Sequence, residues 1–256
     1  MMETIAVAFA MFSAIPVPQP VWNEKNMRYA LCAFPLVGVV CGLTWFGWAY
    51  LADKLTFSCF LQGAGFCLLP IAVTGGIHLD GYADTCDALS SYGSHEKRQE
   101  ILKDPHCGAF AVIRLCSYFV AWFALCSTFQ PVKEDLFCMG IGFVLSRTLS
   151  GLSVSGFPLA KDTGLAHTFA SAADKGRVRN FLLGLMVVLF ISLICIGEIK
   201  GIAMVLAALA VFGYYYKVSK KEFGGISGDL AGWFLQKAEI WMLAVLVACQ
   251  ILEGKV

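Results

Sequence analysis

Residues 29–51 read YALCAFPLVGVVCGLTWFGWAYL, an apolar run without one charged side chain. A helix needs about 20 such residues to cross the hydrocarbon core of a bilayer. Six further runs are long enough, or nearly so, and lie at 57–75, 109–129, 136–155, 181–197, 201–216 and 239–252. We therefore expect an all-α protein, a polytopic transmembrane helical bundle of about seven spans.

The composition of the whole chain agrees with this expectation. Of its 256 residues, 58% are hydrophobic and 14% are charged, whereas about a quarter of the residues of a soluble domain are charged. A formal net charge of +1 gives no bulk attraction to nucleic acid, so we expect no nucleic-acid partner. The eleven cysteines lack CxxC spacing and lie mostly in apolar runs, which indicates reduced thiols and no structural zinc.

Seven spans place the connections alternately on two sides of the membrane. Thirteen of the nineteen Lys and Arg residues then fall on one side and four on the other, and the remaining two lie within spans. Cytoplasmic connections are the richer in Lys and Arg. We therefore expect a cytoplasmic N-terminus, an external C-terminus and an active site carried by the long cytoplasmic loops 76–108, 156–180 and 217–238.

The densest cluster of polar residues follows the second span. Asp80, Asp84 and Asp87 are spaced four and three residues apart, which places them on one face if this segment is helical. Their mutual repulsion favours a divalent cation between them, and oxygen ligands suit magnesium or manganese. The alternative is a solvated helix end. His78 fits a metal ligand, a base or an interfacial histidine equally well.

Glycines and basic residues beside this cluster suit a phosphate-bearing substrate. Gly75 and Gly76 end the second span and let backbone approach a ligand closely. Lys103 can balance phosphate charge, and Asp104 can extend the metal shell. Arg147 lies within a predicted span, where a charge is costly and marks a functional or paired site; snorkelling explains Arg114 equally well.

Two further segments join glycine to a carboxylate. One contains Asp162, and the other contains Gly225, Gly228 and Asp229, with Glu239 following. Such loops can wrap an anionic group with backbone N–H donors while the carboxylate takes a metal or a hydroxyl group. No Gly-Lys-Ser or Gly-Lys-Thr closes a P-loop, so ATP hydrolysis is not indicated.

Together these residues resemble the cobalamin synthases, a family of membrane enzymes also called adenosylcobinamide-GDP ribazoletransferases. The most specific motif is Gly75-Gly76-Ile77-His78-Leu79-Asp80-Gly81-Tyr82-Ala83-Asp84-Thr85-Cys86-Asp87. Supporting motifs are Ile15-Pro16-Val17-Pro18, Phe34-Pro35-Leu36-Val37-Gly38, Ile101-Leu102-Lys103-Asp104, Gly108-Ala109-Phe110, Asp162-Thr163-Gly164-Leu165 and Gly224-Gly225-Ile226-Ser227-Gly228-Asp229.

The resemblance implies a single integral-membrane transferase domain over residues 1–256, in the bacterial or archaeal cytoplasmic (cell inner) membrane. The implied reaction joins alpha-ribazole, or its 5′-phosphate, to adenosylcobinamide-GDP, with release of GMP and with Mg2+ as cofactor. The resemblance implies that Asp80, Asp84 and Asp104 bind the metal. It implies catalytic roles for Asp87, as base or further metal ligand, and for Lys103 and Arg147, which act on the phosphates. The implied substrate-binding residues are Gly75, Gly76, His78, Asp162, Gly225, Gly228, Asp229 and Glu239.

The chain departs from the family pattern at two places. Ala88-Leu89 stands where members carry glycine soon after the third aspartate, and Gln236 stands where they carry an acidic residue. A CDP-alcohol phosphotransferase is the nearest alternative enzyme, but Asp84 follows Ala83 where that family has arginine. A cation-coupled transporter is the alternative from another class; it predicts inverted repeats, which the sequence lacks.

Overall fold

The computed structural model describes residues 2–91, 93–104, 106–161 and 163–254. Within these ranges the secondary structure consists of helices, the connections between them and one isolated bridge between Leu159 and Ile226. The predicted all-α helical bundle is therefore confirmed. The helices are α1 (Met2–Phe12), α2 (Glu24–Met27), α3 (Ala30–Ala33), α4 (Pro35–Lys54), α5 (Cys59–Thr74), α6 (Ile77–Ser90), α7 (His95–Ile101), α8 (Ala109–Thr128), α9 (Lys133–Gly156), α10 (Leu165–Ala172), α11 (Lys175–Phe223) and α12 (Gly228–Leu252).

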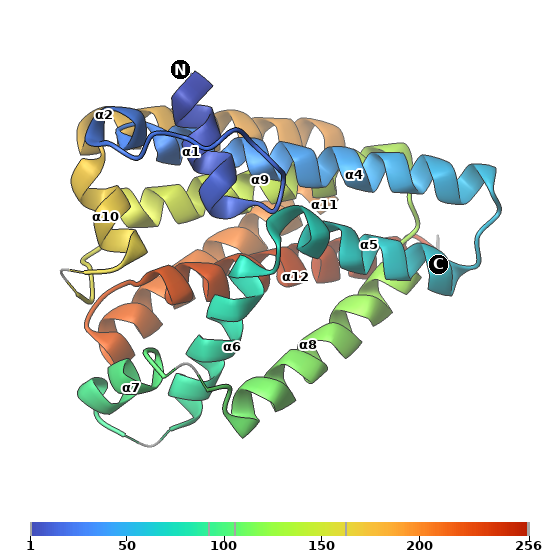
Figure 1. The fold of residues 1–256 in the computed structure, drawn as a ribbon. Coiled ribbons are helices and arrows are strands. Elements are labelled where there is room, and N and C mark those ends of the chain that lie inside the picture. The colour runs from blue at the N-terminus through green and yellow to red at the C-terminus, as the bar shows by residue number, and fades with distance from the viewer. Residues whose placement is uncertain (1, 92, 105, 162, 255–256) are drawn as a thin grey trace.

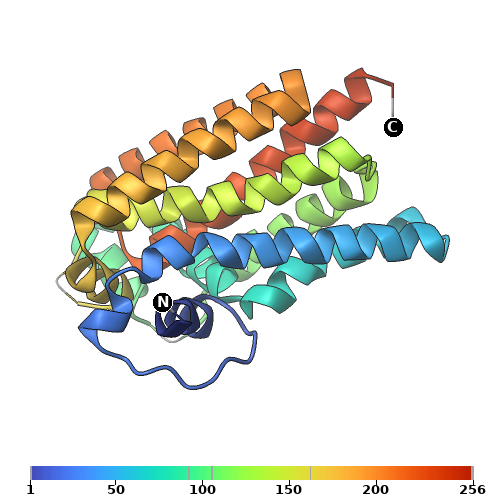
Figure 2. The same ribbon diagram turned by 90° about the horizontal axis from the view of Figure 1, so that it is seen from above.

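Long apolar helices run side by side and form the body of the molecule (Figure 1, Figure 2). In the described chain, five helical segments are long and apolar enough to cross a membrane: Ala30–Lys54, α8, α9, α11 and α12. The pair α5 and α6 makes a sixth if it crosses as one broken span. The predicted number of seven stays a prediction, and it depends on how α5 and α11 cross.

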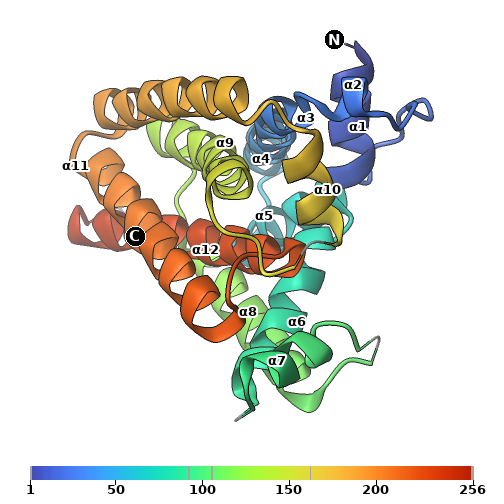
Figure 3. The same cartoon turned by 90° about the vertical axis from the view of Figure 1, so that its left-hand side faces the viewer.

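The helix α11 is interrupted at Glu198, where φ is 47° and ψ is −119°. The interruption lies between the predicted spans 181–197 and 201–216. Figure 3 shows the two arms of α11 as separate helices joined at a turn. Near this turn, Lys200 Nζ lies 2.6 Å from Asp135 Oδ1 of α9, and Gln250 of α12 donates a hydrogen bond of 2.7 Å to Asp135 Oδ2. These polar contacts connect α9, α11 and α12 at one end of the bundle.

The predicted loops are shorter in the structure and partly helical. The predicted cytoplasmic loop 76–108 contains α6 and α7, and the predicted loop 156–180 contains α10. The predicted loop 217–238 is mostly helical, because α11 continues to Phe223 and α12 begins at Gly228; its cytoplasmic position stays a prediction. The reason is that low hydropathy marks where a helix leaves lipid, whereas the helix itself continues as long as its backbone hydrogen bonds do.

Candidate active site

Two glycines turn the chain at the end of α5. Gly75 and Gly76 adopt φ values of 66° and 79°, which side chains other than glycine rarely adopt. The helix α6 therefore leaves α5 at an angle of 95° and runs across the bundle (Figure 1). In the predicted topology α6 belongs to the cytoplasmic loop 76–108, outside the spans. Its polar face carries the three predicted aspartates.

A close helix crossing brings a fourth aspartate to this face. At Gly81 of α6, a Cβ atom would lie 2.7 Å from the backbone oxygen of Asp229 in α12. At Gly232 of α12, a Cβ atom would lie 2.9 Å from the backbone oxygen of His78. The absence of these side chains lets the two backbones touch, so that Asp229 lies beside Asp80 and Asp84.

The four carboxylates interact electrostatically. The pKa of Asp84 is raised to about 6, first by burial and then by the charges of Asp80, Asp229 and Asp87. A site that concentrates negative charge in this way favours a cation. Within the described ranges, however, no three Asp, Glu, His or Cys side chains stand at distances that would hold a metal ion. The fit to magnesium therefore rests on the chemistry of the donors, which are carboxylate oxygens open to a cavity.

Two cavities meet at Asp80. One has a volume of about 670 Å3 and is lined by Gly75, Gly76, Asp80, Asp84, Asp104 and His106, among others. The other has a volume of about 260 Å3 and is mostly apolar; its lining includes Phe12, Phe34, His78, Phe169, Asp80 and Asp229. The site thus combines an acidic cavity with an apolar neighbour, which can take a substrate with a charged part and an apolar ring.

The predicted residues Asp104 and Lys103 lie at the edge of this site, and both are exposed. The Asp104 carboxylate accepts a hydrogen bond of 3.0 Å from the His106 N–H group and lies 2.7 Å from His106 Nδ1. These hydrogen bonds from His106 lower the pKa of Asp104. Asp104 shares the larger cavity with Asp80 and Asp84, as expected of a residue that extends a metal shell.

Two glycine-containing segments meet on the other side of Asp229. The Ala160 N–H group donates to Ile226 O at 2.9 Å, and the Ile226 N–H group donates to Pro158 O at 2.8 Å. Gly225 packs against this backbone, where a Cβ atom would lie 2.5 Å from the Leu159 carbonyl carbon. Gly228 begins α12 and has open space around its Cα atom. Asp162 lies outside the described residues.

Lys161 is a site residue that the sequence prediction missed. Its pKa is lowered by burial and by the charge of Lys103, whereas the charge of Asp229 raises it. Lys161 is therefore close enough to interact with both Lys103 and Asp229, and it places positive charge beside Asp229. The available signal was the position of Lys161 directly before Asp162 in a glycine-containing motif.

The Asp87 carboxylate faces the start of α8. Its Oδ1 atom accepts a hydrogen bond of 3.3 Å from the Ala111 N–H group. A Cβ atom on Gly108, the N-cap residue of α8, would overlap this carboxylate. No side chain of α8 itself caps this helix. Asp87 thus caps α8 from α6, a position that the base and metal-ligand hypotheses did not include.

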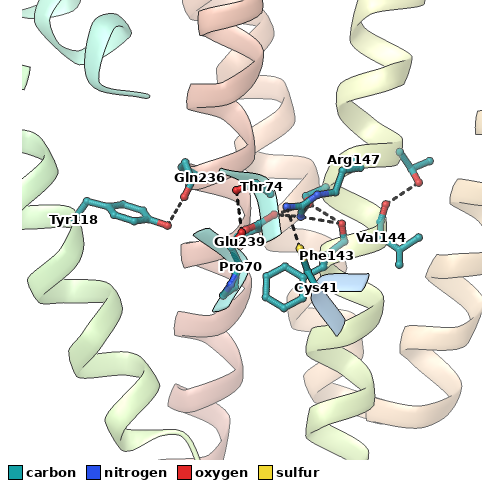
Figure 4. A network of polar contacts seen from close by, with 11 residues as sticks. Cys41, Pro70, Thr74, Tyr118, Phe143, Val144, Arg147, Gln236 and Glu239 are labelled. Atoms are coloured by element: carbon teal, nitrogen blue, oxygen red, sulfur yellow. Dashed lines mark hydrogen bonds and ion pairs between the residues drawn. The ribbon is translucent and has the colours of Figure 1, made fainter. Parts of the chain in front are cut away.

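Arg147 and Glu239 form a buried ion pair between α9 and α12 (Figure 4). Their side chains are 1% and 2% exposed, and Ser146 Oγ donates a further hydrogen bond of 2.9 Å to Glu239 Oε1. Neither residue lines the two cavities at Asp80. The structure therefore groups them with the bundle interior, whereas Asp80, Asp84, Asp104 and Asp229 border the open site.

His78 lies between these two regions. Its side chain is 5% exposed and lines the smaller cavity. Its Nε2 atom is buried and has no hydrogen-bond partner in the described part of the chain. Of its three predicted roles, the interfacial one fits least well, because the imidazole is enclosed. A buried nitrogen without a partner is available to a ligand in this cavity.

Known proteins resemble the chain along nearly its whole length. The family model described as cobalamin-5-phosphate synthase matches residues 4–247. The adenosylcobinamide-GDP ribazoletransferase of Lachnoclostridium phytofermentans is 43% identical over 248 residues, which cover 96% of this chain and 94% of the relative. The protein of the same name from Clostridium botulinum (strain Alaska E43) is 32% identical over 92% of this chain and 93% of the relative. The one from Geobacillus kaustophilus is 33% identical over 93% of this chain and 94% of the relative. No solved structure matches the chain.

Proposed function

The chain belongs to the cobalamin-5-phosphate synthase family, and on that premise we propose that it is an adenosylcobinamide-GDP ribazoletransferase of cobalamin biosynthesis. In this reaction a ribose hydroxyl group of alpha-ribazole, or of its 5′-phosphate, attacks the cobinamide-linked phosphorus of adenosylcobinamide-GDP. The bond from that phosphorus to the GMP oxygen breaks, and the products are adenosylcobalamin, or its 5′-phosphate, and GMP.

The observation that carries this proposal is the convergence of Asp80, Asp84 and Asp229 beside a polar cavity. Transfer at a diphosphate needs positive charge around the phosphate oxygens and a fixed direction of attack. When bound, Mg2+ would supply this charge, held by Asp80 and Asp84 with Asp104 at the rim. Asp229 of α12 adds a further carboxylate that interacts with Asp80 and Asp84.

Basic residues and the apolar cavity have complementary tasks. Lys161, which interacts with Asp229, and Lys103, which interacts with Lys161, would balance the remaining charge of the phosphates. The smaller cavity, bordered by Phe12, Phe34 and Phe169, suits the aromatic base of the ribazole. Its opening at Asp80 would bring the attached ribose toward the diphosphate. Asp87 stays a hypothesis as the acceptor of the hydroxyl proton, beside its contact with α8.

The site is proposed to face the cytoplasm, from the cytoplasmic membrane of a bacterium or archaeon. The basis is the uneven distribution of Lys and Arg, of which thirteen fall on the side of the connections that contain α6, α7 and α10. The substrates are soluble and charged, so access from the cytoplasm is consistent with this orientation.

The test is GMP release by the purified full chain in lipid nanodiscs. Adenosylcobinamide-GDP and alpha-ribazole 5′-phosphate are supplied with Mg2+, and the corrinoid product is identified by mass. We expect Mg2+-dependent turnover that EDTA abolishes and that Asp84→Asn lowers at least about 100-fold, because charge neutralisation at the phosphates is lost. Asp53→Asn, an exposed aspartate at the far end of α4, is the matched control and should retain full activity.

Three outcomes would contradict the proposed function or its active site. Consumption of a CDP-alcohol without corrinoid product, by a folded protein, would assign the metal site to the other transferase family. Inactivity on both substrates, combined with cation uptake into proteoliposomes, would favour the transporter hypothesis. Equal activity of Asp84→Asn and Asp53→Asn would show that the polar face of α6 is not part of the active site.

A further inference from the structure

A second large cavity opens on the side of α6 that faces away from the aspartates. Its volume is about 690 Å3, and its lining includes Tyr82, Cys86, Arg98, Arg114, Trp233 and Lys237. At about 100° per residue, Tyr82 points roughly 140° to 160° and Cys86 roughly 100° to 160° away from the directions of Asp80, Asp84 and Asp87, and none of these aspartates lines the cavity. This cavity is therefore separate from the proposed active site.

The cavity carries an excess of positive charge. Arg98 is neutralised by Glu222, which lies 2.6 Å away. Arg114 and Lys237 have no carboxylate within ion-pair distance in the described part of the chain. Lys237 Nζ instead lies 5.0 Å from the ring centre of Trp233. Two cations without acidic partners suit an anionic ligand.

An apolar groove of about 340 Å3 continues from this cavity between α8 and α12, and it shares Tyr82, Arg114 and Lys237 with it. On α8 the groove is lined by Ser117, Tyr118, Ala121 and Leu125, and on α12 by Ile240, Trp241 and Ala244. In each helix these residues follow the cation at spacings of three or four residues, so each set forms one stripe along its helix. The groove thus leads from two cations into the apolar length of two candidate spans.

We propose that this cavity and groove bind an anionic phospholipid, with the headgroup phosphate at Arg114 and Lys237 and an acyl chain along α8 and α12. Charge complementarity selects the anionic headgroup. The apolar groove selects a lipid over a free phosphate, because a soluble anion would leave the stripe between Ala121 and Ala244 empty. Trp241 lines the groove and is 55% exposed, so its ring supplies an apolar surface for the acyl chain.

The test measures lipid retained by the purified full chain. The protein is extracted from nanodiscs that contain equal amounts of phosphatidylglycerol and phosphatidylcholine, and the bound lipids are counted by native mass spectrometry. We expect the wild type to retain phosphatidylglycerol preferentially. Removal of each cation lowers the affinity about fivefold, so Arg114→Gln/Lys237→Gln should lose this preference. Lys217→Gln/Lys220→Gln removes the same charge from exposed positions of α11 outside the cavity and should keep it.

A second variant tests the contribution of the acyl chain to lipid binding separately from that of the headgroup. Ala121→Trp fills the groove at an exposed position of α8 and should lower retention of phosphatidylglycerol. In a separate competition experiment, inorganic phosphate should not displace phosphatidylglycerol from the protein. Equal retention by the Arg114→Gln/Lys237→Gln protein and its Lys217→Gln/Lys220→Gln control would overturn the proposal. So would unchanged retention by a folded Ala121→Trp protein, or competition by inorganic phosphate or GMP, since either soluble anion would then be the ligand of the cavity.

Discussion

At the scale of single residues, the Asp87 carboxylate touches the first turn of α8 and accepts a hydrogen bond from the Ala111 N–H group. Asparagine retains an oxygen at this position, whereas alanine does not. We therefore expect Asp87→Asn to keep its Tm and to retain kcat within about tenfold, and Asp87→Ala to lose about 1 kcal/mol of unfolding free energy. Thermal unfolding in detergent and GMP release measure the two effects.

The same pair of variants tests the base hypothesis. Loss of a general base lowers the rate by about 10²- to 10⁴-fold. A stable Asp87→Asn protein whose kcat falls by that factor would identify Asp87 as the acceptor of the hydroxyl proton. The contact of Asp87 with α8 would then be secondary to its catalytic role.

The Arg147–Glu239 pair leads to a second prediction at this scale. Removing one partner leaves the other charged and buried, which costs about 3 kcal/mol or more. Arg147→Met and Glu239→Gln should therefore each lower the Tm strongly, and the double variant Arg147→Met/Glu239→Leu should recover most of the loss. We also expect the double variant to retain activity within about tenfold, because neither residue lines the cavities at Asp80. A stable but inactive double variant would instead support the hypothesis that Arg147 stabilises the charge of the substrate phosphates.

These residues show which parts of the site the sequence could predict. The spacing of Asp80, Asp84 and Asp87 follows from helical periodicity, which is local. The position of Asp229 beside them depends on contact between α6 and α12, more than 140 residues apart in sequence. Arg147 looked functional because a charge is costly in a span, and Glu239 because it follows a segment that joins glycine to a carboxylate. Their mutual neutralisation across 92 positions is a tertiary contact that no local pattern contains.

At the scale of elements, the crossing of α6 and α12 determines the geometry of the site. A Cβ atom at Gly81 would lie 2.7 Å from Asp229 O and 2.8 Å from Asp229 Cα, and neither backbone atom can move without separating the helices. Gly81→Ala should cost about 1–3 kcal/mol through overpacking and should lower kcat as Asp229 moves away from Asp84. Chemical denaturation and GMP release measure both.

The matched control is Gly184→Ala in α11, where an added Cβ atom meets nothing within 4 Å. Alanine at an open helical position stabilises by up to about 1 kcal/mol. If Gly81→Ala matched Gly184→Ala in both stability and kcat, the close crossing of α6 and α12 would not determine the site.

The elements themselves were largely predictable. Hydropathy located each long apolar helix, since a spanning segment must be apolar over most of its length. It did not find the direction of α6, which depends on two residues of positive φ, Gly75 and Gly76. It also ended α11 too early, because residues such as Lys217 and Lys221 are exposed and continue the helix beyond its apolar length.

At the scale of the whole molecule, the two arms of α11 decide the topology. If both arms cross and the pair α5 and α6 crosses as one broken span, the number of spans is odd, and the two ends of the chain lie on opposite sides of the membrane. The uneven distribution of Lys and Arg predicts that the N-terminus lies inside. We therefore expect a green fluorescent protein fused to the N-terminus of the full chain to fluoresce, and the same reporter at the C-terminus to be dark. Alkaline phosphatase at the C-terminus should be active.

The polar contacts at the turn of α11 favour this result. Asp135, at the start of α9, is fully buried and is paired with Lys200 and Gln250, so the turn is fixed to the same end of the bundle as the last turns of α12. If α12 crosses from its Gly228 end, its other end and the turn of α11 lie together on the outside. Fluorescence from both fusions would contradict this arrangement. The number of spans would then be even, and either α5 would re-enter the membrane from one side or the arms of α11 would not both cross.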